Sequence, residues 1–249
     1  MTGAGGGAWS VERARASARA LHEAWPSSPA RAGRTVRLCA VAGTPALVLG
    51  SAQDEDVVDG PALARAGLEV LRRGAGGGAV VVSPGAQVWA DLWLPRADPL
   101  WSDDVVASSS WVGELWSAAL SALGVAHLAV HHGPSTTAPW SERVCFAGLG
   151  PGEVTVEGRK VVGVAQRRTR AGARWYTMAP LVWEPALLLS VLGSPAPSES
   201  PAAGAGPDDD AALAQAALGL RSVVPDAADM TDEELIAAAE EAVIGALAP

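Results

Sequence analysis

The later part of the chain contains three apolar segments joined by connections too short for a helical crossover. They span residues 153–157, 160–165 and 175–183, and only Gly158-Arg159 separates the first two. Parallel neighbours would need a crossover of about a dozen residues or more. These segments therefore predict consecutive antiparallel strands, and they limit the fold to one built around such a sheet.

The rest of the chain adds helices and further strands. Two short apolar runs around Gly43-Thr44-Pro45 predict a hairpin, and residues 67–73 suit either a strand or a helix. Elements of both kinds in mixed order predict an α+β fold, with a central mixed, mostly antiparallel sheet flanked by helices. The expected helices span residues 10–25 and 103–123, and the other expected strands span 36–42, 46–49, 79–83, 87–94 and 127–130.

Composition changes at Ser194, where Pro, Ser, Ala, Gly and Asp become dominant up to Asp210. Beyond this stretch the sequence predicts two helices, and the second begins with the capping-box pattern Thr231-x-x-Glu234. The expected division is an N-terminal helix, a main domain, a linker and a C-terminal helical tail, at residues 1–30, 31–195, 196–210 and 211–249.

Composition also narrows the functional classes. The formal net charge is −9, which argues against a general nucleic-acid binder, because phosphate backbones require many basic side chains. No apolar run approaches the length of a bilayer span, so we expect a cytoplasmic protein without a membrane partner. Two cysteines, Cys39 and Cys145, are too few for a disulfide framework and lack metal-ligand spacing, so no metal site is expected.

Lys160 is the one lysine among 18 basic residues. A chain that otherwise uses Arg for its positive charges keeps a single compact ammonium at this position. Lysine and arginine differ in shape and hydrogen-bond geometry. Lys160 is therefore a candidate for a task that Arg cannot perform, although chance could also place one lysine here.

The segment Arg72-Arg73-Gly74-Ala75-Gly76-Gly77-Gly78-Ala79 has the composition of an anion-binding loop. Glycine permits positive φ and close approach of a ligand to the backbone. Consecutive free amides can bind an anion, and arginines add charge-assisted donors. A flexible surface turn with solvated arginines is the alternative, because the segment matches neither a P-loop nor a dinucleotide-binding fingerprint.

A second group of residues surrounds the lysine. In the run Gly158-Arg-Lys160-Val-Val-Gly163-Val-Ala165, the small residues Gly163 and Ala165 fall on one face of the expected strand. That face would let a bulky ligand lie against the backbone, with Lys160 opposite Val161 or at the turn. The alternative is a hairpin with a solvent-facing lysine.

The glycine loop and the lysine strand together resemble the lipoate–protein ligase and octanoyltransferase superfamily. In that family an Arg-rich Ser-Gly-Gly-Gly-Ala loop and a Gly-x-Lys-x-x-Gly-x-Ala strand form one acyl pocket. The order and spacing agree, and Gln53 after Gly50 matches an early Gly-x-x-Gln stretch. The resemblance covers residues 36–192 and implies the biotin/lipoate protein ligase catalytic domain, a class II synthetase-like fold.

The resemblance also implies a chemistry. Ligases of the family activate lipoate or octanoate with ATP and Mg²⁺ to an acyl adenylate. They then acylate a lysine on lipoyl domains of 2-oxoacid dehydrogenase complexes or on the glycine cleavage H protein. By the match, Lys160 would contact the acyl carbonyl and phosphate. The acyl and adenylate side would be lined by Arg72, Arg73, Gly76, Gly77, Gly78, Ala79, Gly163 and Ala165.

Cys145 supports a different chemistry. One branch of octanoyltransferases places a nucleophilic Cys followed by Phe fifteen residues before the family lysine, and Cys145-Phe146 has this separation from Lys160 (160 − 145 = 15). A thiolate near a cation can form an acyl thioester. This interpretation needs octanoyl acyl carrier protein and no ATP, whereas a buried structural cysteine is the simpler alternative.

The sequence departs from the family pattern at four places: Ala75 replaces the loop serine, Val82-Ser83-Pro84 stands where a His-Asp pair is typical, the ligase asparagine falls near Ala86, and the histidine of the last pocket strand falls near Tyr176. The tail after residue 211 is also short for the accessory domain that ligases usually carry. A non-catalytic relative that binds an acyl group or a lipoyl domain is therefore a third hypothesis. The tryptophans Trp89, Trp93, Trp111 and Trp116 suit core packing or the wall of an acyl tunnel.

Overall fold

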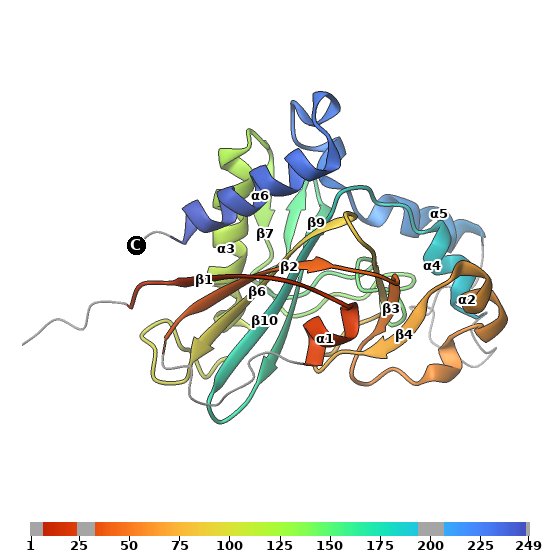
Figure 1. The fold of residues 1–249 in the computed structure, drawn as a ribbon, viewed down its shortest axis with the longest axis horizontal. Helices are drawn as coiled ribbons and strands as arrows, with labels where there is room; N and C mark the ends of the chain where they lie inside the picture. Colours follow the sequence, from red (N-terminus) through yellow and green to blue (C-terminus); the bar gives the residue numbers. More distant parts are fainter. Residues whose placement is uncertain (1–6, 24–32, 194–206, 248–249) are drawn as a thin grey trace, which may run out of the picture.

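The computed structural model describes residues 7–23, 33–193 and 207–247, and its centre is a large, mixed sheet (Figure 1). The strand order is β1-β2-β6-β10-β9-β8-β7, and every neighbouring pair is antiparallel except β1 and β2. The strands of this sheet are β1 (Ser10–Ala16), β2 (Thr35–Val41), β6 (Gln87–Pro95), β7 (Leu128–Val130), β8 (Val154–Val156), β9 (Arg159–Arg168) and β10 (Gly172–Pro180).

A second sheet of three strands has the order β4-β3-β5. It consists of β3 (Ala46–Leu49), β4 (Glu69–Arg72) and β5 (Val80–Val82). The helices are α1 (Ala18–Glu23), α2 (Gly60–Ala66), α3 (Ala107–Ala122), α4 (Ala186–Val191), α5 (Pro207–Ala216) and α6 (Asp232–Ala246). The α+β class and the mostly antiparallel large sheet are confirmed.

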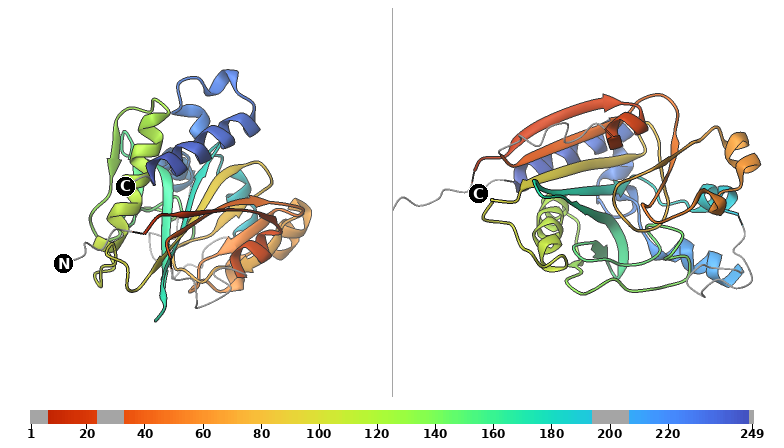
Figure 2. Two further views of the ribbon diagram at one scale, coloured as in Figure 1. Left: turned by 60° about the vertical axis from the view of Figure 1, so that its left-hand side comes forward. Right: turned by 90° about the horizontal axis from the view of Figure 1, so that it is seen from below.

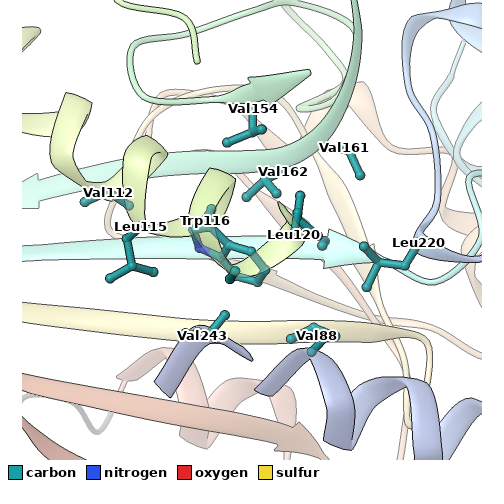
Figure 3. Close-up of a cluster of buried hydrophobic side chains, with 14 of the residues drawn as sticks. Val88, Val112, Leu115, Trp116, Leu120, Val154, Val161, Val162, Leu220 and Val243 are labelled. Atoms are coloured by element: carbon teal, nitrogen blue, oxygen red, sulfur yellow. The ribbon is translucent and has the colours of Figure 1, made fainter. Parts of the chain in front are cut away.

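Helices α3 and α6 cover one face of the large sheet (Figures 1 and 2). Alternate residues of β6 and β10 point to this face, so it receives Val88, Leu92 and Trp175. Trp116 of α3 is fully buried there, and its indole N–H donates to the Thr177 hydroxyl at 2.9 Å. Figure 3 shows this core, in which residues from β-strands meet residues from α3 and α6.

The opposite face of the large sheet packs against α1 and the three-stranded sheet. Leu21 of α1 and Val48 of β3 are buried there beside Trp89. One cavity lies between these layers, lined by Val82 of β5 and by Trp89 of β6. Asp91 of β6 is fully buried on this face, where Arg37 and Arg174 donate to its Oδ2 and the Trp89 indole donates to its Oδ1.

The structure corrects the helix expected over residues 10–25. Residues 10–16 form the edge strand β1, paired in parallel with β2, and Ala18–Glu23 is the helical part of this range within the described residues. Burial alternates along β1: Arg13 and Arg15 are exposed, whereas Ala14 and Ala16 are partly buried. Charged side chains suit an edge strand, because they discourage pairing with another chain.

The hairpin expected around residues 43–45 is also wrong. β2 lies in the large sheet and β3 in the small one, so the turn carries the chain between sheets. Both strands are buried on both faces along most of their length, and each pairs on two sides within its own sheet. The ambiguous segment 67–73 contains strand β4, preceded by Gly67 with φ of 65° at the end of α2.

The C-terminal tail is not a separate packing unit in the structure. Leu235, Ala239 and Val243 of α6 are buried in the same core as α3, because one apolar stripe of α6 faces that helix. The expected capping box at Thr231 and Glu234 is present. Most of the expected linker, residues 196–206, lies outside the described residues, and its last residues 207–210 belong to α5.

Candidate functional site

Lys160 lies near the start of strand β9 and is buried, with 3% of its surface exposed. Its Nζ donates to the carboxylate Oε2 of Glu153 and to the backbone carbonyl of Cys145, each at 2.7 Å. The ammonium also lies 5.2 Å from the centre of the Phe146 ring. The solvent-facing alternative for this lysine is therefore excluded.

The direction of Lys160 depends on an irregularity between β8 and β9. Val154 pairs with Val162, but the next residue, Thr155, pairs with Lys160, so Val161 has no partner across the ladder. One extra residue on a strand shifts the alternation of its side chains. Simple alternation along the sequence would place Lys160 opposite the face of Gly163, whereas both lie against Glu153 and Phe146 in the structure.

Glu153 is the site residue that sequence reasoning missed. Its Oε2 accepts from Lys160 and from the Gly150 amide at 2.6 Å, and its Oε1 accepts from the Val164 amide at 3.2 Å. Both carboxylate oxygens are thus bound to fixed donors. Such a carboxylate compensates the buried ammonium and fixes where its charge lies. A buried lysine needs a carboxylate partner, so an acidic residue close to Lys160 in the sequence was the signal that could have identified Glu153.

Arg73 is buried against the glycine loop and binds its carbonyls, so it is not an exposed donor beside the loop. Arg73 is 4% exposed, and its Nη2 donates to the carbonyls of Gly76 and Gly78 at 2.6 and 2.9 Å. Arg72 is exposed and lines none of the cavities described below. The two arginines expected at one anion site are therefore placed apart.

Close packing explains why this loop is rich in glycine. A Cβ at Gly78 would meet the backbone nitrogen of Val144 at 2.5 Å, and Gly77 has φ of 92°. Ala79 pairs with the same segment, since its amide donates to the Arg143 carbonyl at 2.7 Å. The amides of Gly76, Gly77 and Gly78 donate to no acceptor within the described residues. They are available to an anion.

Gln53 ties this arrangement together. Its side-chain oxygen accepts from the Gly50 amide at 2.9 Å, and its Nε2 donates to the Arg143 carbonyl at 3.1 Å. Gly50 itself lies against the loop, because a Cβ there would fall 1.8 Å from the Gly77 oxygen. The Gly-x-x-Gln pattern thus connects the glycine loop to the segment that leads into Cys145.

Two cavities meet at this site. The smaller has a volume of about 50 Å³, and its walls are mostly apolar; the larger has a volume of about 490 Å³ and contains Lys160, Glu153 and the three glycines. Cys145, Val164 and Ala165 line both cavities. The two cavities therefore adjoin each other beside Cys145 and Ala165.

The smaller cavity runs between the large sheet and the three-stranded sheet. Its other lining residues include Arg73, Val82, Trp89, Phe146, Gly163 and Tyr176. Gly163 leaves room for the Phe146 ring, which would approach a Cβ there to 3.2 Å. Trp89 thus forms part of a cavity wall, whereas Trp116 belongs to the core.

The positions that depart from the family pattern lie in three different environments. Tyr176 lines the smaller cavity and is 7% exposed. Ala75 is buried, and its carbonyl accepts from the Ser51 amide at 2.9 Å. Ala86 is exposed in the turn between β5 and β6 and lines none of these cavities.

Cys145 is partly exposed at the junction of the cavities, whereas Cys39 is buried in β2. Burial raises the pKa of the Cys39 thiol, and the Asp91 carboxylate beside it acts in the same direction. Cys39 is therefore a protonated core residue. Among the described residues no group of three His, Cys, Asp or Glu side chains could hold a metal ion, and no helix could cross a membrane.

Comparison with known proteins defines the class of the molecule. The model of the lipoyl protein ligase A/B catalytic domain matches residues 16–184, so the chain belongs to this family and is an enzyme of the ligase/octanoyltransferase type. A search of curated protein sequences finds no match.

Three lipoate ligases of known structure share this fold. A lipoate-protein ligase A bound with ATP is 16% identical, with a TM-score of 0.68, and the match covers 97% of this chain and 85% of that one. A putative lipoate protein ligase from T. acidophilum with bound lipoic acid is 16% identical, with a TM-score of 0.66, and the match covers 97% of this chain and 85% of that one. The bi-partite lipoate protein ligase of Thermoplasma acidophilum, described with its E2 lipoyl domain, is 18% identical, with a TM-score of 0.64. That match covers 97% of this chain and 83% of the other.

Proposed function

We propose that this protein activates lipoate or octanoate with ATP as acyl-AMP and transfers the acyl group to a lysine of a lipoyl carrier domain. The observation that carries the proposal is the junction of the two cavities. A small apolar cavity adjoins, beside Cys145 and Ala165, a larger cavity that contains Lys160, Glu153 and the glycine loop. The chemistry of this arrangement suits an amphipathic acid with an apolar chain and a charged head, and the chain would widen the smaller cavity of about 50 Å³ as it enters.

The apolar chain would lie in the smaller cavity. Gly163 and Ala165 present little side chain there, and Trp89 and Val82 complete the wall. Burial of each CH₂ group contributes roughly 0.8 kcal/mol. The carboxyl group would then emerge at the junction, next to the segment that carries Cys145.

The head group would meet positive charge on two sides. The amides of Gly76, Gly77 and Gly78 offer consecutive donors without a cost in side-chain ordering. Lys160 presents the buried ammonium, held by Glu153 at 2.7 Å. A cation fixed in this way can stabilise charge that develops on the acyl carbonyl oxygen, by an amount on the order of 3–4 kcal/mol.

ATP and Mg²⁺ are proposed only as far as the residues fit them. The larger cavity, with its free loop amides and the polar segment 134–137, suits a nucleotide phosphate. The carboxylate of Glu153 in that cavity is committed to Lys160 and to two amides. The described residues thus supply no cluster of protein ligands for Mg²⁺, and we derive no step through a protein-bound metal.

The alternative is a Cys145-dependent octanoyltransferase that takes its acyl group from acyl carrier protein. The position of Cys145 favours it, because this partly exposed thiol lies where the acyl carbonyl would emerge. Its backbone carbonyl also binds Lys160, which keeps a cation on the same segment. In that reaction the Cys145 thiolate would attack the octanoyl thioester and release the thiol of the acyl carrier protein. The lysine amine of the lipoyl domain would then attack the new thioester, take the octanoyl group as an amide and release the Cys145 thiol.

The test is a mass measurement of a lipoyl domain after incubation with the full chain. One tube contains ATP, Mg²⁺ and lipoate, and a second contains octanoyl acyl carrier protein without ATP. A mass gain equal to one lipoyl group in the first tube supports the ligase. A gain only in the second supports the transferase, and no gain in either tube contradicts both.

A further inference from the structure

Two polar groups that line the smaller cavity have no hydrogen-bond partner among the described residues. Both ring nitrogens of His22 and the hydroxyl of Tyr176 are buried, and none has a hydrogen-bond partner within the part of the chain that is described. Both residues line the smaller cavity and neither lines the larger one. Tyr176 is the cross-strand partner of Ala165, which lines both cavities, and His22 reaches the smaller cavity from α1.

The other polar groups of this cavity wall are already occupied. Arg73 donates to the carbonyls of Val48, Gly76 and Gly78. The Trp89 indole N–H donates to Asp91 at 2.8 Å. His22 and Tyr176 thus differ from Arg73 and Trp89, because their polar atoms have no hydrogen-bond partner among the described residues. Buried polar groups are almost always hydrogen-bonded, so two unpaired ones on one cavity indicate a ligand that pairs with them.

Packing holds both rings in place. The His22 ring lies 4.6 Å from the Trp89 ring and stacks on Tyr176 at 5.8 Å. The Arg174 guanidinium lies 4.1 Å from the centre of the Tyr176 ring, and it also donates to the backbone carbonyl of His22 at 2.9 Å. The two groups are fixed before any ligand arrives, which lowers the entropic cost of binding.

The imidazole is neutral at physiological pH. Burial lowers the pKa of His22 to about 3; the charge of Asp91 acts in the opposite direction, while Arg174, Arg73 and Arg37 add to the lowering. A neutral imidazole has one donor and one acceptor nitrogen, and a phenol can act as either. This pair can therefore recognise a neutral group that donates or accepts, whereas a methyl group would leave it unpaired.

We propose that His22 and Tyr176 determine acyl specificity by recognising a neutral oxygen or sulfur atom near the far end of a medium-length acyl chain. This inference rests on the proposed function, because it assumes that the apolar cavity holds the chain and that the carboxyl group lies at Cys145. A saturated chain would bury the same hydrocarbon but would leave both polar groups without partners. A site built to bind a polar group discriminates strongly against the analogue that lacks it.

Calorimetric titration of the full chain with three free acids tests the inference: octanoate, 8-hydroxyoctanoate and lipoate. Wild type should bind 8-hydroxyoctanoate about fivefold or more tightly than octanoate, as expected for one net hydrogen bond. Tyr176→Phe and His22→Phe preserve the rings and should reduce this ratio towards one. Met178→Leu changes an apolar residue of the same wall and should leave the ratio unchanged.

The lipoate titration identifies the recognised atom. A loss of lipoate affinity relative to octanoate in Tyr176→Phe would support recognition of sulfur, and a loss confined to the hydroxy acid would support oxygen. Equal wild-type affinity for octanoate and 8-hydroxyoctanoate, or a ratio unchanged in both ring variants, would overturn the inference alone. Failure of all three acids to bind would overturn it together with the proposed function.

Discussion

Lys160 and Glu153 form a buried ion pair, with 2.7 Å between Nζ and Oε2 and with side chains only 3% and 5% exposed. Removing one member leaves an uncompensated charge, which typically costs about 3–5 kcal/mol of unfolding free energy. Glu153→Gln should therefore lower stability in urea denaturation by an amount of this order, and acyl transfer should fall because the ammonium loses its position.

The double variant Glu153→Gln, Lys160→Met separates stability from function. It removes both charges and should recover much of the stability lost in Glu153→Gln, while acyl transfer stays absent because Lys160 is gone. If the double variant is no more stable than Glu153→Gln, the ion pair does not account for the effect.

Lys160→Arg tests whether a different cation can replace the ammonium. The guanidinium is wider and directional, so it cannot occupy the space between Glu153 and the Cys145 carbonyl with the same geometry. We expect loss of acyl transfer by more than about a hundredfold, similar to the loss of one preorganised transition-state donor. Circular dichroism and a melting curve must show that the variant is folded, and activity close to that of wild type would refute the assignment.

The glycine loop offers a matched pair of substitutions. A Cβ at Gly78 would lie 2.5 Å from the Val144 nitrogen, whereas a Cβ at Gly76 meets nothing within 4 Å. Gly78→Ala should therefore lower the melting temperature by several degrees, since overpacking costs about 1–3 kcal/mol. Gly76→Ala should melt close to wild type. The reverse order of the two melting temperatures would refute the close contact between this loop and residues 143–144.

His22 makes the stability of the protein depend on pH. Its pKa is about 3 in the folded protein and 6.5 in an unperturbed side chain, so between these values the unfolded chain binds more protons. The free energy of unfolding should fall as pH falls below 6.5, by up to about 1.4 kcal/mol per pH unit from this group. His22→Gln should show a shallower decline in urea titrations across the upper part of this pH range.

His132 serves as the control, because it is exposed and its contact with Glu114 at 3.3 Å lies at the surface. His132→Gln should leave the slope of the pH dependence close to that of wild type. A His22→Gln slope identical to wild type would mean that His22 is not neutral in the folded protein.

Much of the fold could be predicted from local pattern. The strands over residues 153–183 follow from short connections, and Lys160 follows from its uniqueness among the basic residues and from the motif around it. β1 was missed because a short, charged edge strand has little apolar alternation to distinguish it from a helix. Local pattern also could not show that α6 packs into the main core.

The details of the site depend on tertiary contacts. Glu153 and Glu157 both precede Lys160 in the sequence, and the unpaired Val161 in the ladder brings the lysine to Glu153. His22 and Tyr176 are far apart in the chain. They meet because α1 packs on the face of the large sheet to which the Tyr176 side chain of β10 points. Arg73 has the sequence context of an anion donor, but its guanidinium is bound to carbonyls of its own loop.

Cys145 gives the most direct test of the central claim that the acyl group is activated on AMP rather than on the protein. The full chain and its Cys145→Ala variant are compared for lipoate transfer with ATP, and intact mass is measured after mixing each with octanoyl acyl carrier protein. The ligase predicts that Cys145→Ala retains most of its ATP-dependent transfer, with at most a modest loss of stability from the small cavity left behind. A hydroxylamine-sensitive octanoyl adduct on wild type, absent from Cys145→Ala and formed without ATP, would contradict the ligase and establish the transferase.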